Sequence, residues 1–299
     1  MFQFHDIDRH ALTVLGPRPV GWTDMPSLER DANAWIERLR ARRVAEAERM
    51  GPLSSLHAHV DRMVRTDRPE HLDEPEFPAD DKLKLVHALH RMNIATRAYW
   101  RFTRVLRPWI ERVAAREGRP ARLLELASGS GEFTLALAKA ARDARLPVAI
   151  TGSDYIPEYV ARAREKARAR GLDVRFEVVN AFDMSDCPAG AWDLVFIAQS
   201  AHHFTAGQLA MMIAQSRRMA TTAFVAVDGR RSLQLLAFVP LAAALTGDLH
   251  LVHDGAVTAR KLFTETELAE IARVAAPDAA VTVAHRRPGY SVLTASWAP

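Results

Sequence analysis

A short loop of small residues follows an apolar run that contains one carboxylate. The run covers residues 123–126 and includes Glu125, and the loop after it contains Gly129 and Gly131. Glycines let a backbone turn tightly and let a ligand approach where side chains would intrude. A helical pattern begins at Glu132. A strand, a glycine turn and a helix in this order predict a binding site for a small-molecule cofactor.

The residues around this loop separate two cofactor classes. Dinucleotide sites use the pattern G-x-G-x-x-G, and here Thr134 stands in the place of the third glycine. Glu125 at the strand end would put negative charge near a polyphosphate. S-adenosylmethionine carries a sulfonium and an ammonium group and no phosphate. The sequence therefore favours S-adenosylmethionine over NAD.

The segment from Glu125 to Gly131 resembles the first motif of the class I S-adenosylmethionine-dependent methyltransferases. That motif is acidic-x-Gly-x-Gly-x-Gly, and the chain has Glu125-Leu-Ala127-Ser128-Gly129-Ser130-Gly131. An alanine therefore replaces the first glycine. Ala127 is accommodated without cost if its φ is negative and is strained if the position needs a conformation that glycine favours.

Later landmarks extend the resemblance to roughly residues 70–299. A second apolar run, residues 148–154, ends in Asp154 a little over twenty residues past the glycines, where a carboxylate can hold both ribose hydroxyls. Tyr155 follows it. After a third strand at residues 174–179, the resemblance implies adenine recognition by Asn180, Ala181 and Phe182, with asparagine in place of the usual aspartate. Its amide oxygen can still accept from the adenine amino group.

The fourth predicted strand, residues 192–198, runs into a segment with polar chemistry. Gln199, His202 and His203 follow it, at the edge of an open parallel sheet where ligands bind. We assign Gln199 to the cofactor, and we expect donor and acceptor to meet at the two histidines. His203, and less so His202, is the candidate general base, with packing or substrate positioning as the alternative for both.

The expected reaction is direct SN2 transfer of a methyl group to an oxygen of a small hydrophobic acceptor. Alignment of the reactants can supply about 7–11 kcal/mol, whereas a positioned base adds about 10² to 10⁴ in rate. A base is therefore helpful without being obligatory.

Several residues are candidates for acceptor binding, each with a packing alternative. Asp228 and Arg230 follow the fifth strand, residues 222–227, and could equally form a loop salt bridge. An apolar stretch at residues 235–245 would form a wall of the pocket or part of the core. The helical region also offers side chains that could line the acceptor pocket or pack between helices: Arg97, Tyr99 and Trp100.

The predicted fold is α/β, a Rossmann-like doubly wound sheet. It is mostly parallel with an antiparallel hairpin, residues 281–285 and 290–295, at its C-terminal end. We expect residues 1–118 to form a helical cap and residues 119–299 the methyltransferase core. Within the cap, helical spacing is found at residues 32–44, 53–64 and 83–113, the last interrupted near Pro108.

Composition excludes several other classes. The 299 residues are 48% hydrophobic and 25% charged, which is typical of a globular protein. Cys187 is the sole cysteine, so an internal disulfide and a multi-cysteine zinc site are excluded and a cytoplasmic location is expected. The start of the chain does not resemble a secretory leader, and residues 235–245 are too short to span a bilayer.

Charge and histidine spacing favour neither nucleic acid nor metal as a partner. The net charge is only +4, and the densest basic run, residues 162–170, alternates with alanine as on a solvated helix face. No carboxylate or cysteine completes a convincing ligand set for the histidine pairs His57/His59 and His87/His90. We expect no metal, and a monomer or homodimer.

The residues after the fifth strand make the resemblance closer to quinone-biosynthesis methyltransferases. They are Asp228-x-Arg230-Arg231-Ser232, His253-Asp254-Gly255, Arg260 and Phe263-Thr264. This subgroup implies a small aromatic or polyketide-like substrate. Three alternatives stay open: a protein that binds S-adenosylmethionine without methyl transfer (a cyclase, a regulator or a partner subunit), an RNA methyltransferase, and a dehydrogenase.

Overall fold

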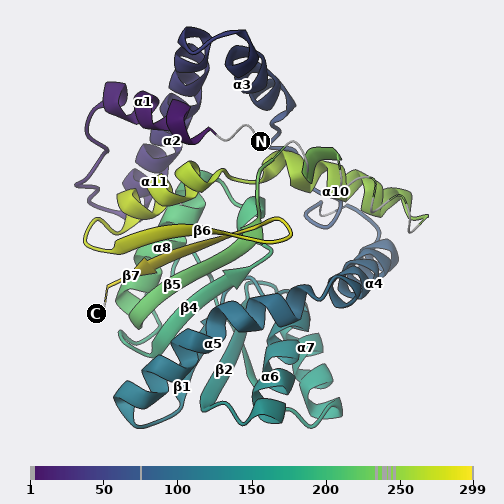
Figure 1. The fold of residues 1–299 in the computed structure, drawn as a ribbon. Coiled ribbons are helices and arrows are strands. Elements are labelled where there is room, and N and C mark those ends of the chain that lie inside the picture. The colour runs from purple at the N-terminus through teal and green to yellow at the C-terminus, as the bar shows by residue number, and fades with distance from the viewer. Residues whose placement is uncertain are drawn as a thin grey trace.

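The computed structural model describes residues 4–74, 76–232, 235–237, 241, 244 and 247–297. Its centre is a seven-stranded sheet of order β3-β2-β1-β4-β5-β7-β6 (Figure 1). The strands are β1 (Ala121–Glu125), β2 (Val148–Asp154), β3 (Arg175–Val178), β4 (Trp192–Ala198), β5 (Ala220–Gly229), β6 (Ala280–Arg286) and β7 (Tyr290–Ser296). The first five run parallel, and β7 pairs antiparallel with both β5 and β6. The predicted fold class and its antiparallel end are confirmed.

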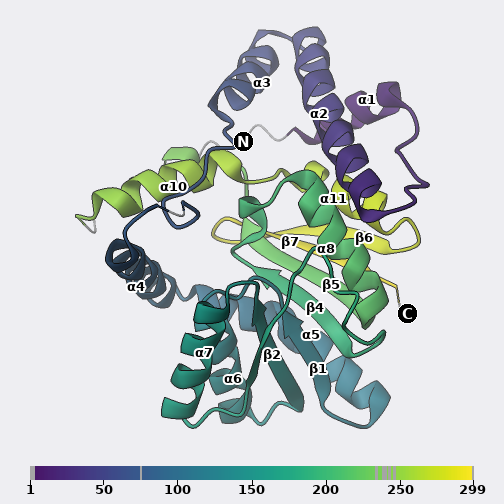
Figure 2. The same cartoon turned by 180° about the vertical axis from the view of Figure 1, so that it is seen from behind.

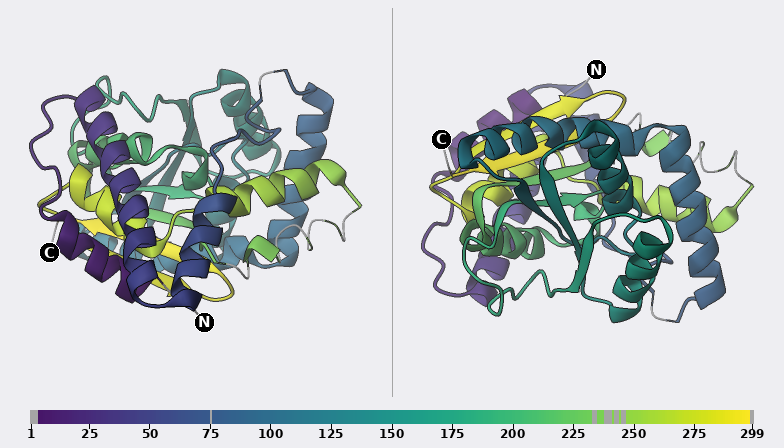
Figure 3. Two further views of the ribbon diagram at one scale, coloured as in Figure 1. Left: turned by 90° about the horizontal axis from the view of Figure 1, so that it is seen from above. Right: turned by 90° about the horizontal axis from the view of Figure 1, so that it is seen from below.

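Helices cover both faces of this sheet. They are α1 (His5–Leu15), α2 (Met25–Arg49), α3 (Pro52–Val64), α4 (Ala79–Ala95), α5 (Ala98–Glu117), α6 (Glu132–Ala144), α7 (Pro157–Ala169), the 3₁₀ turn η1 (Ala201–His203), α8 (Ala206–Met219), α10 (Leu249–Lys261) and α11 (Glu265–Ala275). Seen from above and below, α4 and α10 lie side by side on the side of the sheet away from α1 (Figure 3).

Successive residues of the central strands belong to two separate cores, because side chains alternate between the faces of a sheet. Leu123 packs with α5 and α6, whereas Leu124 packs with α2, α8 and α11. On β4, Phe196 faces the first core and Ile197 the second. Burial on both sides explains why these strands appear in the sequence as continuous apolar runs.

The N-terminal helices α1 and α2 share the second core with α8 and α11 (Figure 2). The helical spacing at residues 32–44 is confirmed, since Trp35, Ile36 and Leu39 are fully buried in α2. Residues 53–64 also form the predicted helix, α3. However, Leu53 and Met63 of α3 are 67% and 78% exposed, so the apolar side of this helix does not face the core.

The predicted interruption near Pro108 is wrong. The helical region breaks instead at Thr96 and Arg97, where Arg97 has φ of 55°, and Pro108 lies inside α5. Proline removes one backbone hydrogen bond, but Phe102, Leu106 and Ile110 form a buried stripe on either side of it. Packing of this stripe on the sheet keeps the helix continuous.

A buried cluster of charges joins the N-terminal helices to α11. We call it the Glu267 cluster, and its members are Asp8, Arg40, Arg43, Asp61, Arg231 and Glu267. Arg43 pairs with Asp8 at 2.6 Å and with Glu267 at 3.2 Å, and Arg40 lies 2.9 Å from Glu267. Burial alone would raise the pKa of Glu267, but the surrounding arginines hold it well below its usual range. Glu267 is therefore a charged anchor at which α1, α2 and α11 meet.

We expect the Glu267→Gln substitution to lower the free energy of unfolding by about 3–5 kcal/mol, because it leaves buried guanidinium groups without their counter-charge. The control is Asp278→Asn, which disrupts an exposed pair with Arg217 and should cost no more than about 1 kcal/mol. Urea unfolding monitored by circular dichroism measures both. Equal losses in the two variants would contradict the anchoring role.

Candidate functional site

The carboxyl ends of the parallel strands meet at one edge of the sheet. Glu125 ends β1 opposite Gly152 of β2 and Phe196 of β4, and Ala198 ends β4 opposite Val227 of β5. The loops that follow these strands therefore share the edge at which ligands bind in open α/β sheets.

The loop after β1 turns through three left-handed residues. Ala127, Gly129 and Gly131 have φ of 50°, 54° and 79°. The sequence left two conformations open for Ala127, and the structure has the strained one, which costs an alanine about 1–2 kcal/mol. The turn is held by Ser128, whose N–H donates to the Ser153 carbonyl at 2.8 Å.

The two glycines of this loop face different surroundings. A Cβ at Gly131 would lie 2.6 Å from the Phe176 ring and 3.0 Å from Ala163, whereas a Cβ at Gly129 would meet nothing within 4 Å. Gly131 is therefore needed for close packing inside the protein. The backbone at Gly129 faces open space, where a ligand can approach.

Asp154 is fixed at the end of β2 by backbone donors. The Gly129 N–H donates to one carboxylate oxygen at 2.8 Å, and the Ile156 N–H donates to the other at 3.0 Å. Burial raises the pKa of Asp154. Each oxygen keeps a lone pair that can accept from a hydroxyl group, as a ribose ligand requires. The neighbouring Tyr155 is 70% exposed and lies free to cover such a ligand.

Glu125 is more deeply buried than Asp154 and has no backbone donor on its carboxyl among the described contacts. Its side chain is 2% exposed and accepts a hydrogen bond from the Thr134 hydroxyl. Burial raises the pKa of Glu125 to about 8. The carboxyl is thus mostly protonated at neutral pH, which departs from the expectation that it presents a standing negative charge. Thr134, which in the sequence marks only a missing glycine, is its partner.

The remaining residues expected at the cofactor follow β3 and β4. Asn180 is exposed and its side-chain oxygen accepts from the Phe182 N–H at 3.0 Å, while Phe182 packs edge-on against Phe204. Ala181, between Asn180 and Phe182 in the chain, is half-buried. Gln199 has φ of 56° and donates through Nε2 to Asn93, a residue of α4 that the sequence did not indicate.

His202, in the turn η1, is held against the end of strand β5 by Asp228. The Asp228 carboxylate accepts from the His202 N–H and lies 2.9 Å from Nδ1. Burial lowers the pKa of His202, but Asp228 and Glu70 together raise it above its usual value. Asp228, near the end of β5, is therefore paired with His202, and it is only 6% exposed.

His203 is paired with the segment between α3 and α4. Its Nδ1 lies 2.8 Å from Asp73, and its Nε2 lies 3.9 Å from Glu70. Burial raises the pKa of Asp73, but His203 and Lys261 bring it well below its usual range. Sequence reasoning missed Glu70 and Asp73. The available signal was the run of acidic residues at positions 67–76, in which both lie.

The other acceptor candidates have structural partners. Arg230 pairs with Glu265 at 3.1 Å, which is the loop salt bridge left open above. Tyr99 packs on Phe133 and hydrogen-bonds His90, and burial raises its pKa to about 12. The other two candidates for acceptor binding lie at the surface. Trp100 is 54% exposed with the Arg104 guanidinium over its ring, and Arg97 is exposed at the start of α5. Most of residues 235–245 lie outside the described residues.

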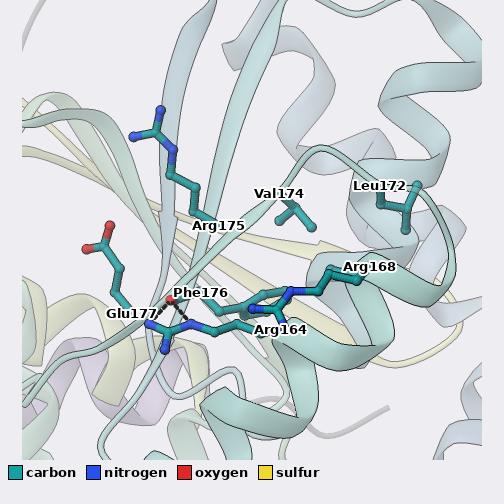
Figure 4. Close-up of a pocket in the computed structure, with 8 residues that line it drawn as sticks. Arg164, Arg168, Leu172, Val174, Arg175, Phe176 and Glu177 are labelled. Carbon is teal, nitrogen blue, oxygen red and sulfur yellow. Dashed lines mark hydrogen bonds between the residues drawn. The ribbon is translucent and has the colours of Figure 1, made fainter.

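A pocket between α7 and β3 lies outside this site (Figure 4). Arg164 and Arg168, from the basic run at residues 162–170, line it beside Phe176. Arg164 donates twice to the Phe176 carbonyl, at 2.9 and 2.6 Å. This arginine thus fastens α7 to the edge strand.

Among the described helices, none combines the length and apolar character needed to cross a membrane.

Comparison with known proteins finds relatives that are methyltransferases. A family model described as a methyltransferase domain matches residues 123–222. The chain is 36% identical over 115 residues to a demethylmenaquinone methyltransferase of Thermus thermophilus, covering 37% of this chain and 50% of the relative. It is 34% identical over 180 residues to the protein of the same name from Deinococcus radiodurans. This match covers 57% of this chain and 68% of the relative. The match thus spans about half the length of the first relative.

Solved structures share the fold at low identity. The plantazolicin methyltransferase BamL, in complex with a triazolic desmethylPZN analog and SAH, has a TM-score of 0.56 and 12% identity over 80% of this chain and 99% of its own. The plantazolicin methyltransferase BpumL in complex with SAH has a TM-score of 0.56 and 11% identity over 80% and 98%. These likenesses concern the fold alone.

We expect Gly131→Ala to be more destabilising than Gly129→Ala. Both substitutions place an alanine in the left-handed region, at about 1–2 kcal/mol, but only Gly131 adds a clash with Phe176, at about 1–3 kcal/mol more. Urea unfolding of the two variants measures the difference. If both lose the same stability, the close packing at Gly131 does not limit the loop.

Proposed function

The chain belongs to the class I S-adenosylmethionine-dependent methyltransferases, and from this premise we propose that it methylates a small hydrophobic metabolite. The family relation supports the cofactor and the general reaction. The observation that carries the proposal is the meeting of the glycine loop and the histidine pair at one sheet edge. Ser200, two residues before His202, donates to the Ala127 carbonyl of the loop at 3.3 Å.

In this proposal the nucleoside lies across the glycine loop. Asp154 accepts from the ribose hydroxyls with oxygens already fixed by Gly129 and Ile156. The segment of Asn180, Ala181 and Phe182 lies beside it, because β3 pairs with β2 and the Val179 N–H donates to the Asp154 carbonyl. This segment receives the adenine, and Ala127, Ser128 and Gln199 face the amino-acid part.

The acceptor lies toward the histidines. Transfer proceeds by SN2: the oxygen of an acceptor hydroxyl forms a bond to the methyl carbon, the carbon–sulfur bond breaks, and sulfur keeps the electron pair. The hydroxyl proton passes to His203. Holding the reactants in line supplies about 7–11 kcal/mol. The curated relatives are named for demethylmenaquinone, a quinone, which supports a hydrophobic aromatic acceptor.

We assign residues 1–118 to covering the site and residues 119–299 to binding the cofactor. Helix α4 supports this role because Asn93 reaches Gln199 at 3.1 Å, and α4 packs against α10 through Leu85 and Leu251. Helix α5 contributes differently, since its buried stripe lies in the core of the sheet.

Methyl transfer is tested by incubating the protein with S-adenosylmethionine and a panel of quinone and phenol acceptors. We expect a product heavier by one methylene in mass spectrometry, and a His203→Ala variant that loses about 10² to 10⁴ in turnover with little change in cofactor affinity. His285→Ala, on β6, serves as the control. Tight cofactor binding without any methylated product would favour the alternative of a binding protein.

We expect Glu125 to make cofactor affinity depend on pH. A carboxyl with a pKa of about 8 is neutral at pH 6 and ionised above pH 8, so its attraction for the permanently charged sulfonium grows as the pH rises. The advantage of the wild type over Glu125→Gln in calorimetric titrations should therefore widen from about pH 6 to about pH 8.5.

The comparison at each pH is needed because the amino group of the ligand titrates near pH 8 as well. Asp154→Ala should weaken binding about 10-fold or more, since it removes the acceptor of the ribose hydroxyls. Equal affinities for the wild type and Glu125→Gln across the range would remove Glu125 from the cofactor site.

A further inference from the structure

Three ligand-type side chains converge beside the glycine loop from two distant parts of the chain. Glu70 precedes α4, and His202 and His203 follow β4. One ligand atom from each lies within 4.8 Å of the other two. We propose that this set, the Glu70–His202–His203 triad, binds a divalent transition-metal ion.

The spacing suits a shared ion better than direct contact. His202 Nε2 lies 3.6 Å from one Glu70 oxygen, and His203 Nε2 lies 3.9 Å from the other. Both distances exceed those of hydrogen bonds. Ligand atoms at roughly 2.0–2.2 Å from one ion stand roughly 3.0–3.5 Å apart. All the ligand atoms lie within 4.8 Å of one another, so inward movement of these side chains would close the site on an ion.

Each ligand is oriented by a second residue. Asp228 lies 2.9 Å from Nδ1 of His202, and Asp73 lies 2.8 Å from Nδ1 of His203. A carboxylate on Nδ1 keeps the proton there and leaves the Nε2 lone pair for a metal. Glu70 accepts from the Thr258 hydroxyl at 2.8 Å. Metal-binding histidines characteristically have such carboxylate partners.

The local charge is also unbalanced without a cation. Glu70, Asp73 and Asp228 bring three negative charges, and Lys261, whose Nζ lies 3.4 Å from Asp73, brings one positive charge. With both imidazoles neutral, these groups sum to −2, which a divalent ion offsets.

Two histidines and one carboxylate leave coordination positions open, as in catalytic zinc and non-haem iron sites. His203 keeps 21% of its side-chain surface exposed, so the triad is accessible. The role of the ion rests on the proposed function. A bound ion would polarise an acceptor hydroxyl and make the loss of its proton to water easier before methyl transfer. In that arrangement His203 is a ligand and not the general base.

A second group, His71, His253 and Asp254, also meets the spacing of a metal site. However, the His71 and His253 rings stack at 4.1 Å with an interplanar angle of 21°, so these rings are engaged with each other. The side chain of His253 is 47% exposed. His253→Ala therefore provides a matched control: it removes a histidine from a neighbouring cluster and leaves the triad intact.

The experiment is calorimetric titration of the chelator-treated full chain with Zn²⁺, with Co²⁺ absorption to report coordination. We expect one ion per chain, with affinity lowered about 10- to 100-fold in Asp73→Asn and more in His203→Ala. His253→Ala should bind as the wild type does. Circular dichroism verifies that each variant is folded.

Absence of Zn²⁺ binding by the wild type, or loss of binding in His253→Ala with retention in Asp73→Asn, would overturn the proposal. Titration of S-adenosylhomocysteine into the same metal-free protein is independent of this outcome. A protein that binds the nucleoside and rejects the ion keeps the proposed function and loses the metal site.

Discussion

The placement of the whole site depends on one buried arrangement of charge, the Glu267 cluster. It joins α1, α2, α3 and α11 to the segment after β5, because Arg231 reaches Asp61 at 2.5 Å and Arg43 reaches both Asp8 and Glu267. Buried charges are costly unless their partners are well placed, so the cluster permits one docking of the N-terminal helices. The segment after α3 then starts from a fixed point. That segment carries Glu70 and Asp73 to the histidines.

The cofactor edge combines a strained loop with two carboxyl groups whose pKa values are both raised by burial. Ala127 adopts a left-handed conformation, and Phe176 leaves room only for glycine at Gly131. Strain of this kind persists where the surrounding structure determines the backbone, as it does at ligand sites. Asp154 accepts backbone hydrogen bonds from Gly129 and Ile156, whereas among the described residues Thr134 is the partner that lowers the pKa of Glu125. In the proposed function the cofactor therefore meets one acceptor held by backbone donors and one buried carboxyl whose charge depends on pH.

The sequence predicts the features that depend on local pattern. Continuous apolar runs such as residues 192–198 identify buried strands, and the order of strand, glycine turn and helix identifies the cofactor edge. Contacts between distant segments have no such signature. Asp73 and His203 are 130 residues apart, and Arg230 and Glu265 are 35 apart, so nothing in their spacing shows that they pair. The interruption predicted near Pro108 was wrong for a related reason. Tertiary packing of α5 outweighs the local effect of the proline, and the helical region breaks at Arg97 instead.

His202 and His203 are adjacent in the chain and belong to different parts of the structure. The partner of His202 is Asp228, at the end of a central strand, and His202 itself is 6% exposed. The partner of His203 is Asp73, on the segment that covers the edge, and Lys261 of α10 steadies that carboxylate. Glu70 belongs to the covering segment as well. The sheet therefore supplies one rigid histidine, whereas the orientation of the other histidine and the carboxylate depends on how the covering segment is docked. In the proposed function, the covering segment is therefore the part of the site that can differ in shape from one acceptor to another, whereas the strand ends are fixed by the sheet.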